Sequence, residues 1–423
     1  MKQIIEDLYL LNRSLVSDDF DRALAYIDDI LGMDIHEYPS GTQCWTWRIP
    51  QKWTVNEAWI EADGERVVDV ADHPLHLWTG SLPVDRVVSR EELVEHLAWK
   101  KDQPRAIPYK FNFYELTWGF SLSYETYQTL DADEYHVYID TEYSDGTLKV
   151  GEATVEGASD EVVVLMAHLD HPGQANDGLS GVAVGVELIE WLRTRDNHYT
   201  YTLLILPETI GSIAYFSHNM NLIPNCRCGI FLEMMGNESQ FAFQHSRQHD
   251  DFIDRAARQA LVERFGEGAF TEGAFRQVVG NDEMVLNGPG VNVPTISISR
   301  WPYWQYHTQF DNMDMISEDS LDESLDVIKD IVDILERDFV PRRKFTGPIF
   351  LSGYGLWVDY NENYALNRAI ERIMLSLEGD MSILDIAANT DVTYDDVYDF
   401  VRRVVELDLA ENLGRGADLD RDG

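Results

Sequence analysis

The chain has 423 residues, 44% of them hydrophobic and 26% charged, a globular composition that excludes a disordered chain, a collagen-like repeat and a disulfide scaffold. Its 75 acidic and 33 basic residues give a formal net charge of −42. Such a field repels phosphate backbones and anionic lipid heads, which predicts that neither nucleic acid nor a membrane surface is a partner. A surface rich in acids and poor in lysine suits a high-salt cytoplasm, or an ordinary acidic cytosolic protein.

The N-terminal 33 residues place apolar positions at helical spacing and predict helices. Charged residues such as Glu6 and Arg13 interrupt the apolar run, so no signal-peptide core is expected. No run of about 18 apolar residues exists, and no membrane span is predicted. Three cysteines make no disulfide framework; Cys226 and Cys228 resemble half a metal site, but buried thiols are the better interpretation. These features together predict a cytoplasmic protein.

Apolar and polar residues alternate over residues 45–70, which predicts short strands. Residues 71–133 show a different sequence pattern, with a helix-like stretch at 89–101. From residue 134 onward, apolar strands alternate with helices. This pattern predicts an α/β fold, a three-layer sandwich with a mixed, mostly parallel central sheet. In such folds, functional sites gather beyond the carboxyl ends of the strands. The expected strands are 134–143, 147–157, 161–171, 201–209, 228–236 and 293–300, and the expected helices are 179–195, 252–265 and 320–340.

A boundary is expected near residue 345, followed by a tail of three helices at 364–379, 382–391 and 393–409, with Thr393 as the N-cap of the third. The short second helix and the turn after it give a helix-turn-helix outline. From residue 359 to the end, however, 16 acidic residues face 6 basic ones, which argues against DNA contact. A protein contact, such as a homo-oligomer interface, is the preferred interpretation of the tail.

The strongest chemical signal is the segment 168–181, which follows an apolar strand and opens a helix. Imidazole nitrogens and carboxylate oxygens are ligands of zinc, and one carboxylate can bridge two metals. Gly178 and Gly181 permit a tight turn and close helix packing. The side chains of this segment that could serve a metal centre are those of His168, Asp170, His171 and Asp177.

Three more strands are followed by polar residues of the same kind. Glu208 and Glu233 each follow an apolar strand, and His307 comes shortly after the strand at 293–300. Each alone is a weak signal, because an acid at a strand end is often merely solvated. Together they would converge on one edge of the sheet with at least two histidines and three acids, enough for one or two metals and a general base.

The ordered motifs HLDH…AND.LSG, E..GS, EM.G and YHT..D resemble the signature of the co-catalytic zinc aminopeptidases. These are the bacterial leucyl aminopeptidase and aminopeptidase Y superfamily, which also holds glutaminyl cyclases. The stretches EYPSG, PLHLWTGS, IPY, WGFSLS and ANDGLSG resemble an aminopeptidase-like branch with an inserted domain and a winged-helix tail, over nearly the whole chain. This resemblance implies a catalytic domain at 1–56 and 134–345, an inserted α+β domain at 57–133 and a winged-helix-like domain at 346–423.

The resemblance also implies roles for residues. His168 would bind one zinc and His307 the other, Asp177 would bridge the metals, and Glu233 would complete the His168 side. Asp170 would hold His168 in its tautomer and orientation. Further ligands or substrate contacts are expected among His171, Asp282 and Tyr306.

One departure from the family pattern bears on activity. The superfamily has two adjacent glutamates, a general base and a zinc ligand, whereas here Pro207 precedes Glu208. Glu208 cannot fill both roles, so a single tightly held zinc or an unequal pair is expected. The implied reaction is hydrolysis of an amide bond in a peptide or other small substrate by metal-activated water, with Glu208 accepting the proton.

Two alternatives stay open. One is a zinc hydrolase or acyltransferase acting on a non-peptide amide, for example in cell-surface polysaccharide metabolism. The other is a non-catalytic scaffold that keeps the fold. Metal ligands at His168, Asp177, Glu233 and His307 argue against the scaffold.

Overall fold

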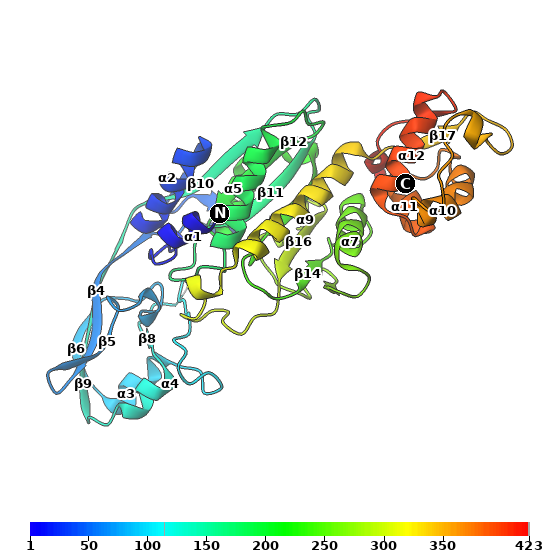
Figure 1. Cartoon of the computed structure of the whole chain (residues 1–423). Coiled ribbons are helices and arrows are strands. Elements are labelled where there is room, and N and C mark those ends of the chain that lie inside the picture. Colours follow the sequence, from blue (N-terminus) through cyan, green and yellow to red (C-terminus); the bar gives the residue numbers. More distant parts are fainter. Residues whose placement is uncertain (114, 422–423) are drawn as a thin grey trace. The chain divides into compact units, whose positions relative to one another are not determined.

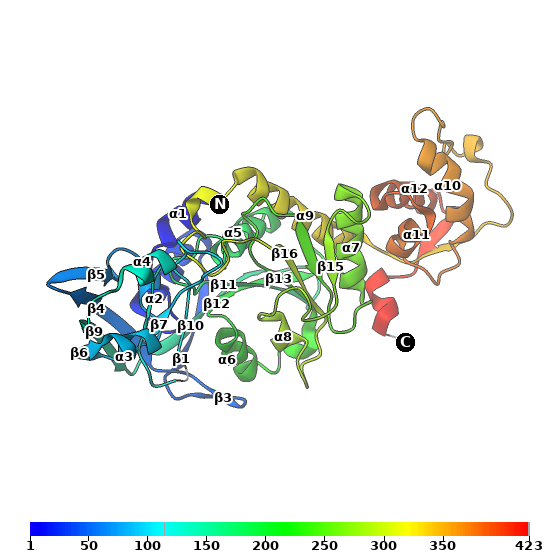
Figure 2. The same cartoon turned by 90° about the horizontal axis from the view of Figure 1, so that it is seen from below.

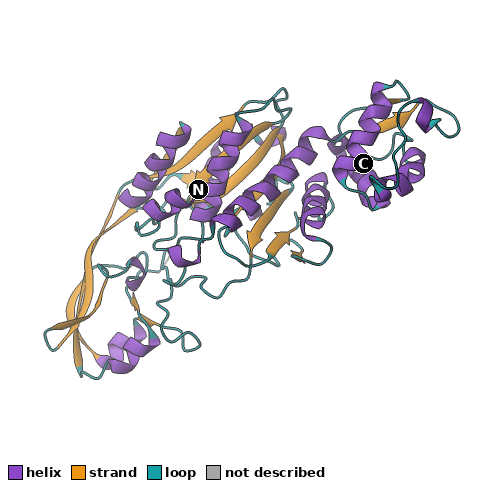
Figure 3. Cartoon of the chain, in the orientation of Figure 1, coloured by secondary structure: helices purple, strands orange, loops and turns teal. Residues whose placement is uncertain are grey.

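A computed structural model of the chain describes residues 1–113 and 115–421 (Figure 1). The chain divides into two compact units. The first comprises Met1–Ala242 and Arg276–Leu325, and the second comprises Phe243–Phe275 and Asp326–Gly423. Figure 3 shows helices and strands in both units. Among the described residues, no helix has the length and the apolar character that crossing a membrane requires.

The largest element of the fold is a mixed sheet of eight strands. In spatial order they are β1 (Asp34–Pro39), β10 (Thr147–Val155), β12 (Thr200–Leu206), β11 (Val162–His168), β13 (Cys226–Leu232), β16 (Thr295–Arg300), β14 (Phe241–Gln244) and β15 (Thr271–Gly273). The four strands from β12 to β16 run parallel, whereas β1 and β10 pair antiparallel. Figure 2 shows α5 (Leu179–Leu192) on one face, and α6 (Ile210–His218) and α8 (Glu283–Leu286) on the other. The predicted α/β sandwich is confirmed.

The central strands are buried along almost their whole length because helices cover both faces of the sheet. Every residue of β12 and β13 is buried, and so is β11 apart from its first residue. On the α6 face, Ile213 and Phe216 pack in one cluster with Met166 and Leu204. On the α5 face, eleven residues of α5 are buried, which explains why this helix shows little amphipathic pattern.

The register of the parallel strands determines where their polar ends meet. His168 of β11 lies opposite Leu206 of β12, and Met166 lies opposite Phe231 of β13. Because parallel strands end at the same edge, the residues that follow them are brought together there.

A second sheet lies within the first unit and has its own core. Its four antiparallel strands are, in order, β5 (Glu65–Asp69), β4 (Lys52–Ala62), β9 (Glu134–Ser144) and β6 (Val84–Ser89). The helix expected at 89–101 is shorter than predicted: α3 covers Arg90–Glu95 only. Leu97–Ala98 form strand β7 with β8 (Phe120–Ser121) instead, because Leu97 and Phe120 pack into the same hydrophobic core.

The second unit contains α7 (Phe252–Phe265) and the tail helices α10 (Tyr364–Leu375), α11 (Ile383–Thr390) and α12 (Tyr394–Glu406). The three predicted tail helices are confirmed, and the Thr393 side chain accepts a hydrogen bond from the Asp396 N–H, as expected of an N-cap. Strands β17 (Pro341–Arg343) and β18 (Ala410–Asn412) pair antiparallel in this unit. The winged-helix assignment stays a prediction. Helix α9 (Glu318–Arg337) contributes residues to both units.

Candidate metal centre

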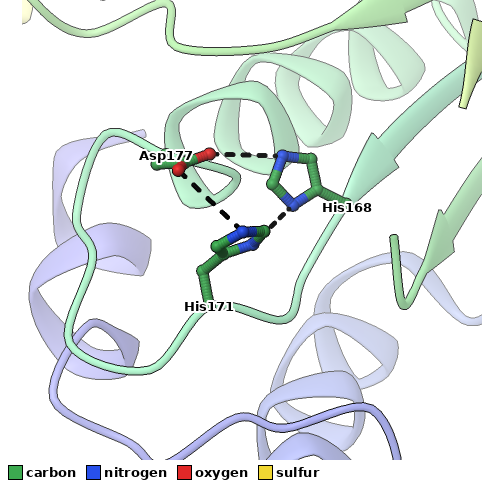
Figure 4. Close-up of side chains that lie close together, drawn as sticks. All are labelled: His168, His171 and Asp177. Carbon is green, nitrogen blue, oxygen red and sulfur yellow. Dashed lines mark hydrogen bonds and ion pairs between the residues drawn. The ribbon is translucent and has the colours of Figure 1, made fainter. Parts of the chain in front are cut away.

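Three predicted ligands from different elements meet at the carboxyl edge of the sheet. His168 ends β11, Asp177 lies in the turn before α5, and Glu233 follows β13. His168 Nε2 lies 3.4 Å from Asp177 Oδ1 and 3.4 Å from Glu233 Oε1. All three side chains are at least 98% buried, and Figure 4 shows His168 and Asp177 turned toward each other. The structure therefore brings together residues that lie up to 65 positions apart in the chain.

These three residues fit a zinc ion. Tetrahedral zinc with ligand distances of about 2.0–2.1 Å places neighbouring ligand atoms about 3.3 Å apart. The separations of 3.4 Å between His168 Nε2 and the two carboxylate oxygens match this value. In addition, His168 Nε2 and Glu233 Oε2 are buried atoms without a hydrogen-bond partner, and Asp177 Oδ2 and His307 Nε2 face each other at 3.0 Å. Unpaired buried polar atoms are costly, so their convergence points to a bound cation.

The other carboxylate oxygen of Asp177, Oδ2, faces a second group of side chains. Asp177 Oδ2 lies 3.0 Å from His307 Nε2 and 4.0 Å from His171 Nε2. His171 Nε2 in turn lies 3.5 Å from Glu208 Oε2. Glu208 is the most accessible member, with 29% of its side chain exposed. The two oxygens of Asp177 thus face two different groups of donors, the arrangement that a bridging carboxylate requires.

The loop between His168 and α5 is held by backbone geometry and by one buried acid. Gly178 has a φ of 87°, and a Cβ atom there would lie 2.7 Å from the His168 carbonyl oxygen. The Asp311 carboxylate accepts hydrogen bonds from the N–H groups of Ala175, Asn176 and Asp177 at 3.0, 2.6 and 3.1 Å. Asp311 is the final residue of the YHT..D motif, so the sequence carried a signal for it, although no role was predicted.

Arg13 supports the same loop through hydrogen bonds, and no role was predicted for it. Its fully buried guanidinium donates to the carbonyl oxygens of Leu169, His171 and Gln174 at 2.7, 2.7 and 3.1 Å, and also to that of Leu8. Burial lowers the pKa of Arg13 to about 10, although nearby acids, Asp170 foremost, oppose the shift. No motif marks this arginine, because its partners are backbone atoms far away in the chain.

Two predicted acids position the turn that carries Glu208. Asp170 Oδ1 accepts the Glu208 N–H at 2.7 Å and lies 3.7 Å from His168 Nδ1. Asp282 Oδ1 accepts the Thr209 N–H at 2.9 Å and the Ser212 hydroxyl. Thr209 adopts a φ of 64°, a costly conformation for a β-branched residue that these bonds help to hold.

Burial and neighbouring charges shift the pKa values of these groups in different directions. Burial, followed by the charges of Asp170 and Asp282, raises the pKa of Glu208 well above its usual value, although His168 opposes the shift. Burial likewise lowers the pKa of His171 to about 4, which leaves a neutral imidazole at pH 7. Burial disfavours the charged form of Asp177, but His171 and His307 outweigh it and lower the pKa of this carboxyl.

Aromatic rings enclose the histidines. The ring of Tyr306, a predicted contact, stacks on His307 with centroids 3.8 Å apart. Tyr109 lies in the segment between β7 and β8 and was not predicted as a site residue. Its ring lies edge-on to His171 and His307, at 5.3 and 5.2 Å, and its N–H donates to the His307 carbonyl oxygen at 2.8 Å. The IPY stretch was the one signal for it in the sequence.

Comparisons with known proteins show the family to which the chain belongs. Residues 2–338 match the family described as "Domain of unknown function (DUF4910)". A Clostridium acetobutylicum protein named "Putative polysaccharide biosynthesis protein with aminopeptidase-like domain" is 30% identical over 338 residues, covering 79% of this chain and 77% of that protein. These matches confirm the predicted resemblance to the aminopeptidase-like proteins.

Two of the similar solved structures illustrate the range of likeness. One, described as a "putative peptidase" from Clostridium acetobutylicum, has a TM-score of 0.88 and 27% identity, and covers 97% of this chain and 96% of that one. A zinc aminopeptidase from Bacillus subtilis has a TM-score of 0.58 and 13% identity, with 78% and 93% covered, and this second likeness concerns the fold alone.

Proposed function

The chain belongs to the DUF4910 family, and from that premise we propose that it is a zinc-dependent hydrolase that cleaves an amide bond. The observation that carries the proposal is the buried set of His168, Asp177 and Glu233, in which His168 Nε2 lies 3.4 Å from a carboxylate oxygen of each acid, the spacing of neighbouring zinc ligands. The relatives named as aminopeptidase-like or as a peptidase support the amide substrate.

In this proposal, His168, Asp177 and Glu233 hold the first zinc, and His307 with the second oxygen of Asp177 faces a weaker second ion. Bound zinc supplies Lewis acidity, which polarises a carbonyl group and lowers the pKa of a water molecule. Each ligand histidine must be neutral to bind, so the Asp170 side chain near His168 Nδ1 favours the tautomer with a free Nε2.

Glu208 is the proposed proton acceptor. It is the acid nearest to solvent in the site, and burial together with its acidic neighbours raises its pKa well above its usual value, which favours a carboxyl that accepts a proton. The bonds from Asp170 and Asp282 fix the turn that aims it. Glu208 would take a proton from the attacking water and pass it to the leaving nitrogen.

A panel of aminoacyl amides and short peptides tests the proposal. The zinc-loaded protein should hydrolyse at least one substrate, and Glu208→Gln should lower kcat by about 10²–10⁴-fold while leaving the first zinc in place. Glu156→Gln, an acid outside the site, is the matched control. A zinc-loaded protein with no turnover on any amide would argue against hydrolysis.

A non-peptide amide is the second candidate substrate. The name of the 30% identical relative refers to polysaccharide biosynthesis, which favours an amide on a sugar. N-acetylated sugars therefore belong in the same panel, and turnover of these alone would select this candidate over a peptidase.

A further inference from the structure

The loss of one glutamate leaves a gap in the ligand set of the weaker metal. Pro207 occupies the position before Glu208, where an acid could have bound. If Glu208 serves as the proton acceptor, only His307 and one oxygen of Asp177 remain as protein ligands on that side. Two protein ligands make an incomplete zinc site, because catalytic zinc is normally held by three.

His171 belongs to two groups of donor atoms that lie close enough to hold an ion, one with His168 and Asp177 and one with Asp170 and Glu208. Its Nε2 atom is 4.0 Å from Asp177 Oδ2 and 3.5 Å from Glu208 Oε2, and its ring centroid is 5.5 Å from that of His307. The side chain is 95% buried, and Figure 4 shows it turned toward Asp177 and His168. His171 therefore faces the same oxygen of Asp177 that His307 faces.

The hydrogen bonds of His171 determine which of its nitrogens is free. His171 Nδ1 lies 2.9 Å from the carbonyl oxygen of Asp170, an atom that can only accept a hydrogen bond. A proton on Nδ1 would satisfy this oxygen and leave the Nε2 lone pair facing the pocket, while His168 Nδ1 is the second neighbour of the same nitrogen, at 3.1 Å. This is the arrangement typical of a metal-binding imidazole, whose other nitrogen donates to a carbonyl or carboxylate.

The backbone of His171 is held in place as firmly as its ring. Its φ of 98° is rare for a residue with a side chain. Arg13 bonds it on both sides: the Arg13 carbonyl accepts the His171 N–H at 3.2 Å, and the guanidinium donates to the His171 carbonyl at 2.7 Å. The hydrogen bonds to Arg13 hold this strained backbone, and the backbone fixes the orientation of the His171 side chain.

We infer that His171 is the replacement ligand: with His307 and Asp177 it completes the second metal site and leaves Glu208 free to accept a proton. The inference rests on the proposed function for the presence of metal, and it concerns which residues bind the second ion. It also explains why a histidine follows His168 at this spacing.

Metal titration of the full chain tests the inference. We expect the wild type to bind two zinc ions with unequal affinity by calorimetry and elemental analysis. His171→Gln should bind one, with the tighter affinity changed by less than about threefold, and Glu208→Gln should still bind two. His36→Gln, a half-buried histidine paired with Glu152 elsewhere in the unit, is the control and should bind two.

The opposite results would overturn it: two ions bound by His171→Gln with wild-type affinities, or loss of the second ion in Glu208→Gln alone. X-ray absorption of the two-zinc wild type avoids any folding defect in a variant. It should detect three imidazoles shared by two metals, and two would contradict the inference. A wild type that binds no zinc would instead refute the proposed function, so the two failures are distinguishable.

Discussion

Arg13 shows how a single residue without a motif can hold a site together. Its guanidinium serves four carbonyl groups, three of them in the segment that runs from the end of β11 toward Asp177. The sequence placed Arg13 in a predicted helical region, where an arginine is normally solvated. Its role could not be predicted, because carbonyl partners 156 or more positions away leave no trace in side-chain identity.

Replacing Arg13 should be costly. Arg13→Met leaves several buried carbonyl groups without donors, and we expect the free energy of unfolding to fall by about 3 kcal/mol or more. Urea denaturation measures this change. Arg22→Met removes an exposed arginine paired with Asp19 and should change stability by less than about 0.5 kcal/mol. Equal effects of the two substitutions would refute the supporting role of Arg13.

Asp338 predicts a pH dependence in the second unit. It is 1% exposed, its Oδ1 accepts the Leu384 N–H at 2.7 Å, and burial raises its pKa to about 8. Because the folded pKa lies above the unfolded value, the folded state binds the extra proton between about pH 4 and pH 8. The free energy of unfolding should therefore fall as pH rises through this window.

The variant Asp338→Asn keeps the acceptor oxygen and removes the titration. Between pH 5 and pH 8, its free energy of unfolding should fall by about 2 kcal/mol less than that of the wild type, as measured by urea denaturation of the full chain. Asp399→Asn, an exposed acid of α12, serves as the control and should keep the wild-type slope. Identical slopes for wild type and Asp338→Asn would show that Asp338 does not titrate in this window.

At the scale of elements, the packing of α5 against β13 sets the position of Glu233. Gly181 of α5 approaches the strand so closely that a Cβ atom would lie 2.1 Å from the Leu232 carbonyl oxygen and 3.2 Å from the Glu233 nitrogen. This close packing was predicted from the glycine spacing, and the structure bears it out. Two elements far apart in the chain are thus coupled through one missing side chain.

Gly181→Ala should displace the end of β13. We expect a loss of at least about 2 kcal/mol in the free energy of unfolding and weaker zinc binding, because Glu233 moves with Leu232. Gly185→Ala in the same helix is the matched control, since its Cβ atom would meet flexible leucine methyl groups, the nearest 3.0 Å away. Thermal unfolding and zinc titration of both variants compare them, and a smaller effect of Gly181→Ala than of Gly185→Ala would contradict this account.

Most elements could be predicted because each carries its own pattern, such as the apolar run of β11 or the N-cap Thr393 of α12. The helix expected at 89–101 was overestimated because local spacing cannot show that Leu97 pairs with Phe120 as a strand. The residues of the site likewise divide into those with a local pattern and those placed by tertiary contacts. Residues at strand ends, such as Glu208 and Glu233, could be predicted to converge, whereas Tyr109 reaches the site by a path that only the tertiary fold defines.

At the scale of the whole molecule, the net charge of −42 predicts a response to salt. Self-repulsion among exposed acids destabilises the compact state, and salt screens it over about 10 Å at 0.1 M and about 3 Å at 1 M. The Tm should rise by at least about 3 °C between 0.05 and 1 M NaCl, as measured by calorimetry. A Tm that is constant or falls over this range would show that the acids are spaced widely enough for repulsion to be negligible.

The division of the chain into units depends on contacts that no local pattern reveals. Residues 243–275 group with the tail, and within that unit Arg255 pairs with Asp385 at 3.2 Å. The sequence predicts a boundary near residue 345 because a long helix and the basic residues 342–344 end there. The domain assignment at 1–56 with 134–345, 57–133 and 346–423 stays a prediction.

The central claim is that His168, Asp177 and Glu233 form a zinc site at the carboxyl edge of the sheet. Anomalous diffraction at the zinc edge, from crystals grown with zinc and without chelator, tests it most directly. We expect a peak within about 2.0–2.2 Å of His168 Nε2, Asp177 Oδ1 and Glu233 Oε1. A zinc-loaded crystal with no peak between these three atoms would contradict it.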